Sequence, residues 1–287
     1  MQPQSDKQKV AIVTDSAVCL PSSVIREYDI HVVPFQLIWN GNAYLDGEEM
    51  TRSEFFQRFS QAVNYPTTAQ PSPESFAHAY ERAAQEAESI LSIHVPADLA
   101  TTIRVAGLMA KEAPVPARVM NAGTAGPAQG LVVLAAPRAA KAGGGLTQVG
   151  AVAKACSQRA GMYLTLDTLE HLRRGGRIGR AATLLGTRLN IQPVLELKDG
   201  QVQVTTVTRS RERAKERILD EVSERVGTIP IECSVCHADA PKETKELVQR
   251  VRERFRCKEL YMVEFTPVMG AHTGPGVLGV AFCLEGG

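Results

Sequence analysis

The sequence predicts an α/β protein of two domains, and three observations support this prediction. Short apolar runs alternate with helical runs over roughly the first 140 residues, which favours a parallel sheet covered by helices. Three consecutive glycines, Gly143–Gly145, then interrupt the alternation. Signals for antiparallel pairing occur only in the second half. We therefore expect an N-terminal parallel-sheet α/β domain over residues 1–160 and a C-terminal α/β domain with a mainly antiparallel sheet over residues 161–287.

Strands in the first half are expected where short apolar runs break at polar or turn residues. A parallel strand that is covered on both faces has such a continuous apolar run. The runs are residues 10–14, 30–39, 89–94 and 119–121. The second run ends at Asn40-Gly41-Asn42, which is a turn signal. Segment 66–73 has three prolines and no periodicity, so we expect a loop there.

Helices are expected between these strands. They are predicted at 21–28, from Arg52 onward, and at 73–86, 99–112, 127–140 and 146–159. Thr51 and Glu54 have capping-box spacing, and Ser72 followed by Pro73 has the pattern of an N-cap and a first helical residue. Pro137 is expected to kink its helix or to end it early, because proline lacks an N–H.

The second half carries the antiparallel signals. Asp199-Gly200 joins apolar runs at 194–197 and 202–207, which predicts a β-hairpin. A further strand is expected at 280–282, and residues 171–177 have the pattern of a helix end followed by a turn.

Composition excludes several classes of protein. The chain has 287 residues, of which 44% are hydrophobic and 22% charged, a profile that is typical of a soluble globular protein. The net charge of +1 argues against a dedicated nucleic-acid binder. The longest apolar run, 130–136, is far shorter than the roughly 20 residues of a membrane span. Residues 1–9 lack the apolar region of a signal peptide, and we expect a cytoplasmic protein.

The cysteines do not form an evident metal motif. They are Cys19, Cys156, Cys233, Cys236, Cys257 and Cys283. Cys233 and Cys236 have metal or redox spacing, but they stand without a second pair or a histidine cluster. They also lie in a strand-like run, where residues three apart point to opposite faces. We favour buried free thiols over a metal or redox site.

Five polar segments lie beside apolar strands or helix ends, where an open α/β sheet usually binds its ligand. They are residues 14–16, 67–72, 173–180, 208–211 and 270–276. Each has a structural alternative as a helix cap, a connecting loop or a basic surface turn. The glycines of the third segment allow close approach of a ligand, and its arginines suit a carboxylate or a phosphate. Arg177, which precedes Ile178, is the arginine that we expect to point inward.

Three donors are candidates to converge on one anion. We expect His272 and Thr273 in a fixed turn formed by residues 270–276, where an imidazole suits an acidic ligand. The three donors are this His272 together with Thr68 and Arg177. Walker A, dinucleotide-binding, zinc-protease and nucleophile-elbow motifs are all missing from the sequence. The residues alone therefore predict an anion site near an apolar cavity.

In their order along the chain, these motifs resemble the DegV family of fatty-acid-binding proteins, over residues 10–282. The segments that carry the resemblance are 13–16, 66–72, 172–178, 189–195 with Asp199-Gly200, and 270–276. The resemblance implies a two-domain α/β fold, with an acyl chain in a tunnel of the first domain and its carboxyl group near the domain interface. It also implies that the chain is the lipid-carrying subunit of a bacterial fatty-acid kinase, whose separate ATP-binding subunit phosphorylates the carboxylate.

The resemblance also supplies site residues and partners. Thr68, Arg177 and His272 match the family's motifs by position, and Arg209 matches the arginine that follows the hairpin. The full ligand-binding set that we expect is Asp15, Ser16, Thr68, Thr101, Thr102, Arg177, Arg209, His272 and Thr273. The expected partners are a long-chain fatty acid, the ATP-dependent kinase subunit and, transiently, a membrane surface. We expect no catalytic residue, no metal, and no cofactor apart from the bound fatty acid.

The sequence departs from the family pattern at three positions. Leu99-Ala100-Thr101-Thr102 stands in place of Leu-Ser-Gly-Thr, so Ala100 lacks the hydroxyl that binds the head group. Ala69 and Ala122 replace two further serines. Thr101 and Thr102 are candidates to supply the missing hydroxyl.

Two other functions are open on the residues alone. The first is an enzyme that acts on a small carboxylic acid, with His272 as general base and Arg177 holding the anion. The second is a regulatory protein that binds a small ligand and changes partner. Against the first, no second titratable group is evidently placed to work with His272.

Overall fold

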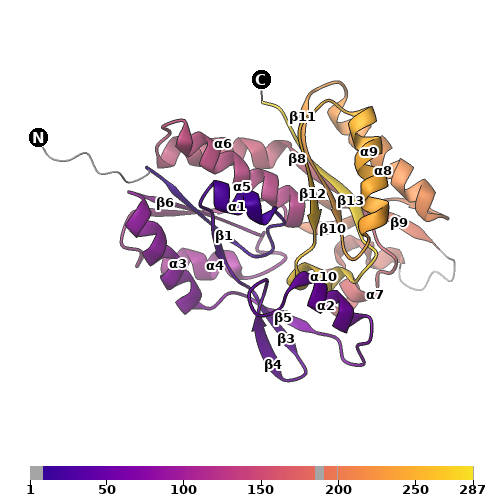
Figure 1. Ribbon diagram of the computed structural model, residues 1–287, viewed down its shortest axis with the longest axis horizontal. Helices are drawn as coiled ribbons and strands as arrows, with labels where there is room; N and C mark the ends of the chain where they lie inside the picture. Colours follow the sequence, from indigo (N-terminus) through magenta and orange to yellow (C-terminus); the bar gives the residue numbers. More distant parts are fainter. Residues whose placement is uncertain (1–8, 185–190, 199, 287) are drawn as a thin grey trace, which may run out of the picture.

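Within the part of the chain that the structure describes, the strands form three sheets, which Figure 1 shows in place. The computed structural model describes residues 9–184, 191–198 and 200–286. Their sheets have four, six and three strands. The predicted α/β class, with one parallel and one mainly antiparallel sheet, is confirmed.

The parallel sheet contains the strands of the first half in the order β2-β1-β6-β7. Its strands are β1 (Ala11–Asp15), β2 (His31–Val33), β6 (Ile90–His94) and β7 (Ala117–Asn121). The two central strands are buried along their whole length. On β1, Ala11 and Val13 face a cluster with α3 and α4, whereas Ile12 faces the cluster with α5. Alternate residues therefore point to opposite faces, as a strand between two helical layers requires.

Five helices accompany this sheet. They are α1 (Ser22–Glu27), α3 (Pro73–Glu86), α4 (Thr102–Met109), α5 (Gly126–Lys141) and α6 (Leu146–Arg159). The predicted helix at 99–112 is shorter than expected, because the amides of Leu99 and Ala100 turn back to the carbonyl of Pro96 before α4 begins. The predicted early end at Pro137 is wrong. Proline removes only one N–H from the helix. The next residue, Arg138, forms ion pairs with Glu232 and Glu259 of the six-stranded sheet, and these hold the last turn in place.

The second sheet has the order β10-β9-β8-β13-β11-β12, and every neighbouring pair except β11 and β12 is antiparallel. Its strands are β8 (Ala160–Thr165), β9 (Gln192–Lys198), β10 (Gln201–Thr208), β11 (Ile231–His237), β12 (Cys257–Glu264) and β13 (Leu278–Leu284). The predicted hairpin is confirmed as β9 and β10, although Asp199 lies outside the described residues, as do 185–190 with part of the 189–195 motif. Helices α8 (Arg211–Val226) and α9 (Pro241–Arg254) cover one face (Figure 1).

A third, small sheet was not expected from the sequence. It has the order β4-β3-β5, with β3 (Gln36–Trp39), β4 (Asn42–Leu45) and β5 (Thr67–Ala69), and α2 (Arg52–Phe59) follows β4. The single strand predicted at 30–39 is wrong: it is divided into β2 and β3, which belong to different sheets, and Pro34, which has no N–H for a ladder, lies between them. The loop predicted at 66–73 is wrong in part, because it contains β5, which pairs with β3.

The predicted N-caps of two helices are confirmed. Thr51 accepts a hydrogen bond from the amide of Glu54, and Ser72 accepts one from the amide of Ser75.

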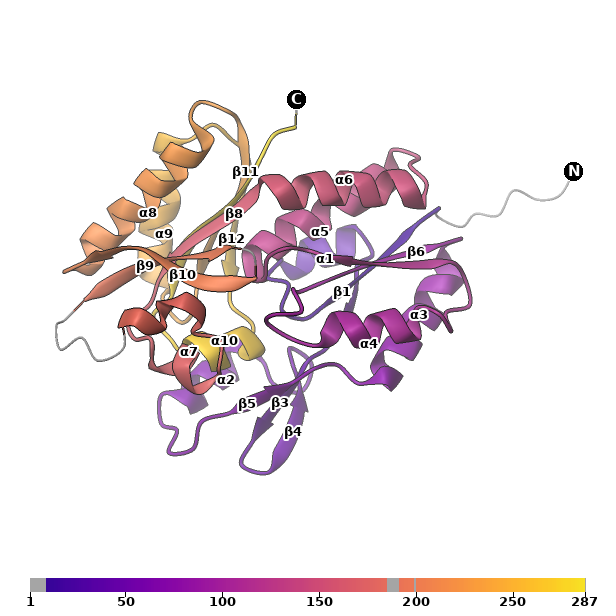
Figure 2. The ribbon, with the colours of Figure 1, turned by 180° about the vertical axis from the view of Figure 1, so that it is seen from behind.

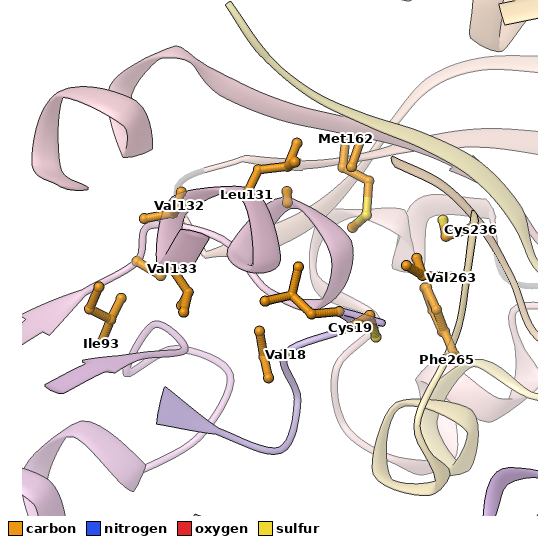
Figure 3. Close-up of a cluster of buried hydrophobic side chains, with 14 of the residues drawn as sticks. Val18, Cys19, Ile93, Leu131, Val132, Val133, Met162, Cys236, Val263 and Phe265 are labelled. Atoms are coloured by element: carbon orange, nitrogen blue, oxygen red, sulfur yellow. The ribbon is translucent and has the colours of Figure 1, made fainter. Parts of the chain in front are cut away.

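Helix α5 lies between the parallel sheet and the six-stranded sheet. Eleven of its 16 residues are buried, and Figure 3 shows Leu131, Val132 and Val133 between Ile93 of β6 and Met162 of β8. One continuous core therefore joins the two sheets. The domain boundary that we expected between residues 160 and 161 stays a prediction. Strand β8 of the six-stranded sheet begins at Ala160, and α5 packs against both sheets. Within the described ranges, every helix is too short or too polar to cross a membrane.

Two short helices complete the region around the third sheet. They are α7 (Glu170–Arg174) and α10 (Pro267–Thr273), and α10 packs against both α7 and α2 (Figure 2). A 3₁₀ helix, Gly179–Leu184, follows α7. Gly270 makes the close packing of α10 on α2 possible, since an added methyl group would lie 2.6 Å from a ring carbon of Phe55.

The packing of α10 predicts opposite effects for the same substitution in two helices. We expect Gly270→Ala to lower the free energy of unfolding by about 1–3 kcal/mol, because the methyl group overpacks the aromatic cluster of α2. Gly107→Ala in α4 meets no atom within 4 Å and should raise the free energy by roughly 0.5–1 kcal/mol through helix propensity. Urea unfolding of both variants measures this. Equal shifts of the two midpoints would contradict the packing described for α10.

Candidate functional site

A cavity of about 730 Å³ lies between the two halves of the chain. This volume is within the range of roughly 300–1,000 Å³ that is usual for small-molecule sites. Residues before and after position 160 line it in similar numbers. The apolar face of the six-stranded sheet forms one wall of this cavity. The acyl tunnel inside residues 1–160 stays a prediction.

The wall of the cavity is largely apolar. Its large aliphatic and aromatic side chains include Phe35, Val95, Met162, Leu164, Leu195 and Phe265. Met162, Leu164 and Leu195 point from β8 and β9 to the same side of the sheet as α5. A hydrocarbon chain that enters this space leaves water, which stabilises it by about 0.8 kcal/mol per CH₂ group. This part of the cavity suits an extended apolar group.

Polar side chains gather in another part of the lining. Thr68 lies on β5, Arg177 follows α7, and His272 lies in the last turn of α10. Thr68 Oγ1 and His272 Nε2 are 2.8 Å apart, although 204 residues separate them. The structure thus brings together the three donors that the sequence singled out. The turn expected at 270–276 is wrong for its first residues, since α10 extends to Thr273 and the chain turns only at Gly274.

Arg177 is half-buried and partly held by backbone carbonyls. Its Nε donates to the carbonyl oxygen of Leu99 at 3.0 Å, and its Nη1 donates to that of Gly175 at 2.6 Å. Burial lowers the pKa of Arg177, but a guanidinium remains charged at neutral pH. Gly176, with φ of 68°, makes the turn that leads to Arg177, and this backbone conformation favours glycine. Arg177 is thus a fixed cation with donors left for an anion.

His272 is neutral at pH 7. Burial lowers its pKa from 6.5 to about 4, and the positive charge of Arg177 acts in the same direction. Nδ1 is buried without a hydrogen-bond partner among the described residues, and it faces Gly175, where any side chain would collide with it. A buried N–H without a partner is costly, so we assign the proton to Nε2, which donates to Thr68 Oγ1. The Thr68 hydroxyl is then free to donate its own hydrogen to a ligand.

Two further expected residues line the cavity with hydroxyls that are already engaged. Thr101 Oγ1 donates to Gln70 Oε1, and Thr273 Oγ1 donates to the carbonyl oxygen of Met269 at 3.0 Å. Ala100 also lines the cavity, next to Thr101. Gln70 is a polar lining residue that we did not single out, although it lies within the predicted 67–72 segment.

Four expected residues do not line the cavity. Asp15 is buried and accepts hydrogen bonds from the amides of Ala17 and Val95 and from Gln129 Nε2. It also lies 2.9 Å from His94 Nδ1. Ser16 Oγ donates to Asp46 and accepts from the amide of Phe35. Thr102 is buried away from the cavity, and Arg209 is exposed outside it.

Asp46 is a supporting residue that the sequence did not indicate. Its carboxylate accepts from Ser16 Oγ at 2.6 Å and from the amide of Val268 at 3.0 Å, so it joins the end of β4 to the start of α10. Burial raises the pKa of Asp46 to about 6. Leu45-Asp46-Gly47 looks like an ordinary turn, which is why no sequence signal marked it.

The described residues contain no cluster of three or more histidine, cysteine, aspartate or glutamate side chains that could hold a metal ion. The prediction that Cys233 and Cys236 are buried free thiols is confirmed.

This arrangement defines a two-domain α/β protein with a buried, largely apolar ligand cavity and a basic polar region. The family model described as "Uncharacterised protein, DegV family" matches residues 9–285. The chain therefore belongs to the DegV family, as the sequence motifs predicted.

Individual relatives support this assignment. A DegV domain-containing protein of Streptomyces coelicolor is 37% identical over 273 residues, which are 94% of this chain and 97% of the relative. A fatty-acid-binding DegV family protein of Thermus thermophilus has a similar structure, with a TM-score of 0.91 and 34% identity over 96% of this chain and 100% of that chain. A stearic-acid-binding protein of Eubacterium ventriosum, at 24% identity over 96% of this chain and 98% of its own, has a TM-score of 0.88 and shows the fold alone.

The environment of His272 predicts its titration. In NMR spectra of ¹³C-histidine-labelled protein, assigned with His272→Gln, we expect a midpoint near pH 4. Arg177→Gln should raise it, because one of the two causes is removed. Since the pKa is lower in the folded chain, the unfolded chain binds the proton first. The free energy of unfolding should therefore fall as the pH is lowered from about 6.5 toward 4, because in that range His272 binds a proton in the unfolded chain but not in the folded one. A midpoint near 6.5 in the wild type would contradict the buried position.

Proposed function

We propose that the chain binds a long-chain fatty acid. The acyl tail occupies the apolar part of the cavity, and the carboxylate lies against Thr68, Arg177 and His272. The observation that carries this proposal is the combination, in one cavity, of an apolar wall with a fixed cation, Arg177, and the Thr68 hydroxyl, whose hydrogen is left free by the bond from His272. The fatty-acid-binding relative of Thermus thermophilus, at 34% identity, supports the same ligand class.

The energetics favour a ligand whose tail supplies most of the affinity. Burial of a chain of about 16 carbons contributes on the order of 12 kcal/mol before the costs of association are subtracted. A charge-assisted hydrogen bond from the protein adds roughly 1.5–3 kcal/mol. The polar groups therefore mainly fix the orientation of the carboxylate, while the tail fixes the strength of binding.

We further propose that the bound carboxylate is presented to an ATP-dependent kinase subunit in the cytoplasm. The support is the DegV resemblance together with the polar lining, in which Arg177 and Thr68 can hold a carboxylate without a covalent bond. A transient contact with a membrane surface, through which a fatty acid enters or leaves, belongs to the same proposal.

The alternative of an enzyme that acts on a small acid has less support. A general base is most effective when its pKa lies near the working pH. The pKa of His272, about 4, makes it a weak base at neutral pH. An apolar wall of this extent also exceeds what a small acid needs. The family assignment favours binding over catalysis as well.

Lipid extraction tests the proposed function in two steps. We expect organic extraction of the purified chain, followed by mass spectrometry, to release a fatty acid. Because the tail supplies most of the affinity, C16 acids should rebind to the delipidated chain far more tightly than C8 acids. The reloaded chain is then given to a bacterial fatty-acid kinase with ATP, and acyl phosphate is trapped with hydroxylamine. Equal C8 and C16 affinities would contradict the lipid site, whereas tight C16 binding without acyl phosphate would contradict only the presentation step.

Ala100 predicts a gain of affinity. Ala100 lines the cavity at the position where the DegV pattern that the sequence resembles has a serine, so Ala100→Ser adds a hydroxyl donor near the proposed carboxylate. A donor to a charged group is worth about 1.5–3 kcal/mol, so fatty-acid binding should tighten by about tenfold or somewhat more. Displacement of a fluorescent fatty acid measures this.

The matched control for this test is Ala97→Ser, which adds the same hydroxyl at an exposed residue of the cavity lining and should leave the affinity unchanged. Unchanged or weaker binding by Ala100→Ser would place the carboxylate elsewhere, or show that another group already fills the position.

A further inference from the structure

Two buried thiols outside the ligand cavity are in direct contact. Cys156 lies in the last turn of α6, and Cys283 lies near the end of β13. Both cysteines are free, and their Sγ atoms are 2.8 Å apart although 127 residues separate them in sequence. The sulfurs of a disulfide are about 2.05 Å apart, so a small adjustment of the two side chains is enough to form the bond.

The surroundings make the two thiols unequal. The two thiols share a hydrogen bond in which either sulfur can donate, and this contact lowers the pKa of Cys283. The charge of Arg159 lowers the pKa of both thiols, but its guanidinium is also hydrogen-bonded to Cys283, and its Nε donates to the carbonyl oxygen of the neighbouring Leu284 at 3.0 Å. The pKa of Cys156 is raised by the contact between the two thiols and by burial. Because Arg159 and the end of β13 lie beside Cys283, we assign Cys283 as the thiol that reacts first and Cys156 as the one that reacts with it afterwards.

The location of the pair limits which reagents reach it. Cys156 and Cys283 are 4% and 6% exposed, so a bulky oxidant is excluded in the resting fold. Glu285 and Gly286, which follow Leu284, are exposed, so we expect local opening of this end of β13 to admit a reagent to Cys283. A small oxidant suits such a site.

We propose that Cys156 and Cys283 form a reversible oxidation site, a dithiol that hydrogen peroxide converts into a disulfide between α6 and β13. The Cys283 thiolate attacks one peroxide oxygen and breaks the O–O bond, which gives a sulfenic acid and a hydroxide that takes up the thiol proton. Cys156 sulfur then attacks Cys283 sulfur, and the second oxygen leaves as water with the Cys156 proton. Two thiols are oxidised, and one peroxide is reduced to two waters. A dithiol reductant reverses the reaction.

A second thiol pair provides an internal comparison. Cys233 and Cys257 lie on the neighbouring strands β11 and β12 and also share a hydrogen bond. The guanidinium of Arg252 lowers the pKa of Cys257, as that of Arg159 lowers the pKa of Cys283. If proximity of thiols alone decided the outcome, both pairs would be oxidised together.

Peptide mapping of the wild-type chain is the primary test. The folded protein is treated with a small excess of hydrogen peroxide, its remaining thiols are alkylated in denaturant, and it is digested without reductant. We expect a cross-linked peptide that contains Cys156 and Cys283, two fewer alkylated cysteines, and full recovery after dithiothreitol. The unfolding temperature should rise on oxidation and fall again on reduction, because the new bond closes a long loop. A cross-link between Cys233 and Cys257 alone, or no cross-link at all, overturns the proposal.

Variants separate the roles of the two thiols. Cys156→Ala should stop the reaction at the Cys283 sulfenic acid, which dimedone labels, and Cys283→Ala should leave Cys156 alkylated. Cys236→Ala, which removes another buried thiol of the same core, should still form the cross-link. Dimedone labelling of Cys156 in preference to Cys283 would reverse the assigned roles. Peptide mapping of the wild-type chain tests whether the Cys156–Cys283 disulfide forms, even if one of these variants does not fold.

Discussion

The position of α5 is the constraint on which the other parts of the fold depend. Its residues are apolar around most of the helix, so both the parallel sheet and the six-stranded sheet have to cover it. Each sheet consequently presents one apolar face toward the middle of the molecule. Ala125, immediately before α5, lines the cavity together with Leu164 and Leu195 of the six-stranded sheet. The cavity is therefore found beyond the start of this helix, where apolar faces lie opposite each other without a helix between them.

The polar region of the cavity depends on the close packing of two short helices. His272 of α10 packs against Gly175 at the end of α7, and His171 of α7 packs against Gly274 at the end of α10. A side chain at either glycine would overlap the facing imidazole. This reciprocal contact explains why both the Gly-Gly-Arg and the His-Thr-Gly motifs have glycine at these positions. It also holds Arg177 and His272 close enough for the charge of one to lower the pKa of the other.

Much of the fold could be predicted from the sequence, because its strands have local signals. The parallel strands, the hairpin of β9 and β10, and the caps at Thr51 and Ser72 all follow from patterns within a few residues. What escaped prediction depends on tertiary contacts. Strand β5 exists because β3 offers it an edge, and the helical form of α10 depends on α2 and α7. For the same reason, the motif containing Asp15 and Ser16 was recognised, but its role in joining β1 to Asp46 and His94 was not.

The three alanines that depart from the family pattern have different consequences in this fold. Ala69 and Ala100 line the cavity, so each leaves one fewer hydroxyl toward a ligand. Ala122 is fully buried after β7, where its amide donates to the carbonyl oxygen of His94, and it does not line the cavity. Only two of the three changes therefore bear on the proposed carboxylate. Arg177 and the Thr68–His272 pair remain in place there, and the apolar wall is unaffected. If the tail supplies most of the affinity, the loss of two neutral donors weakens the hold on the carboxylate without removing the reason for a fatty acid to bind.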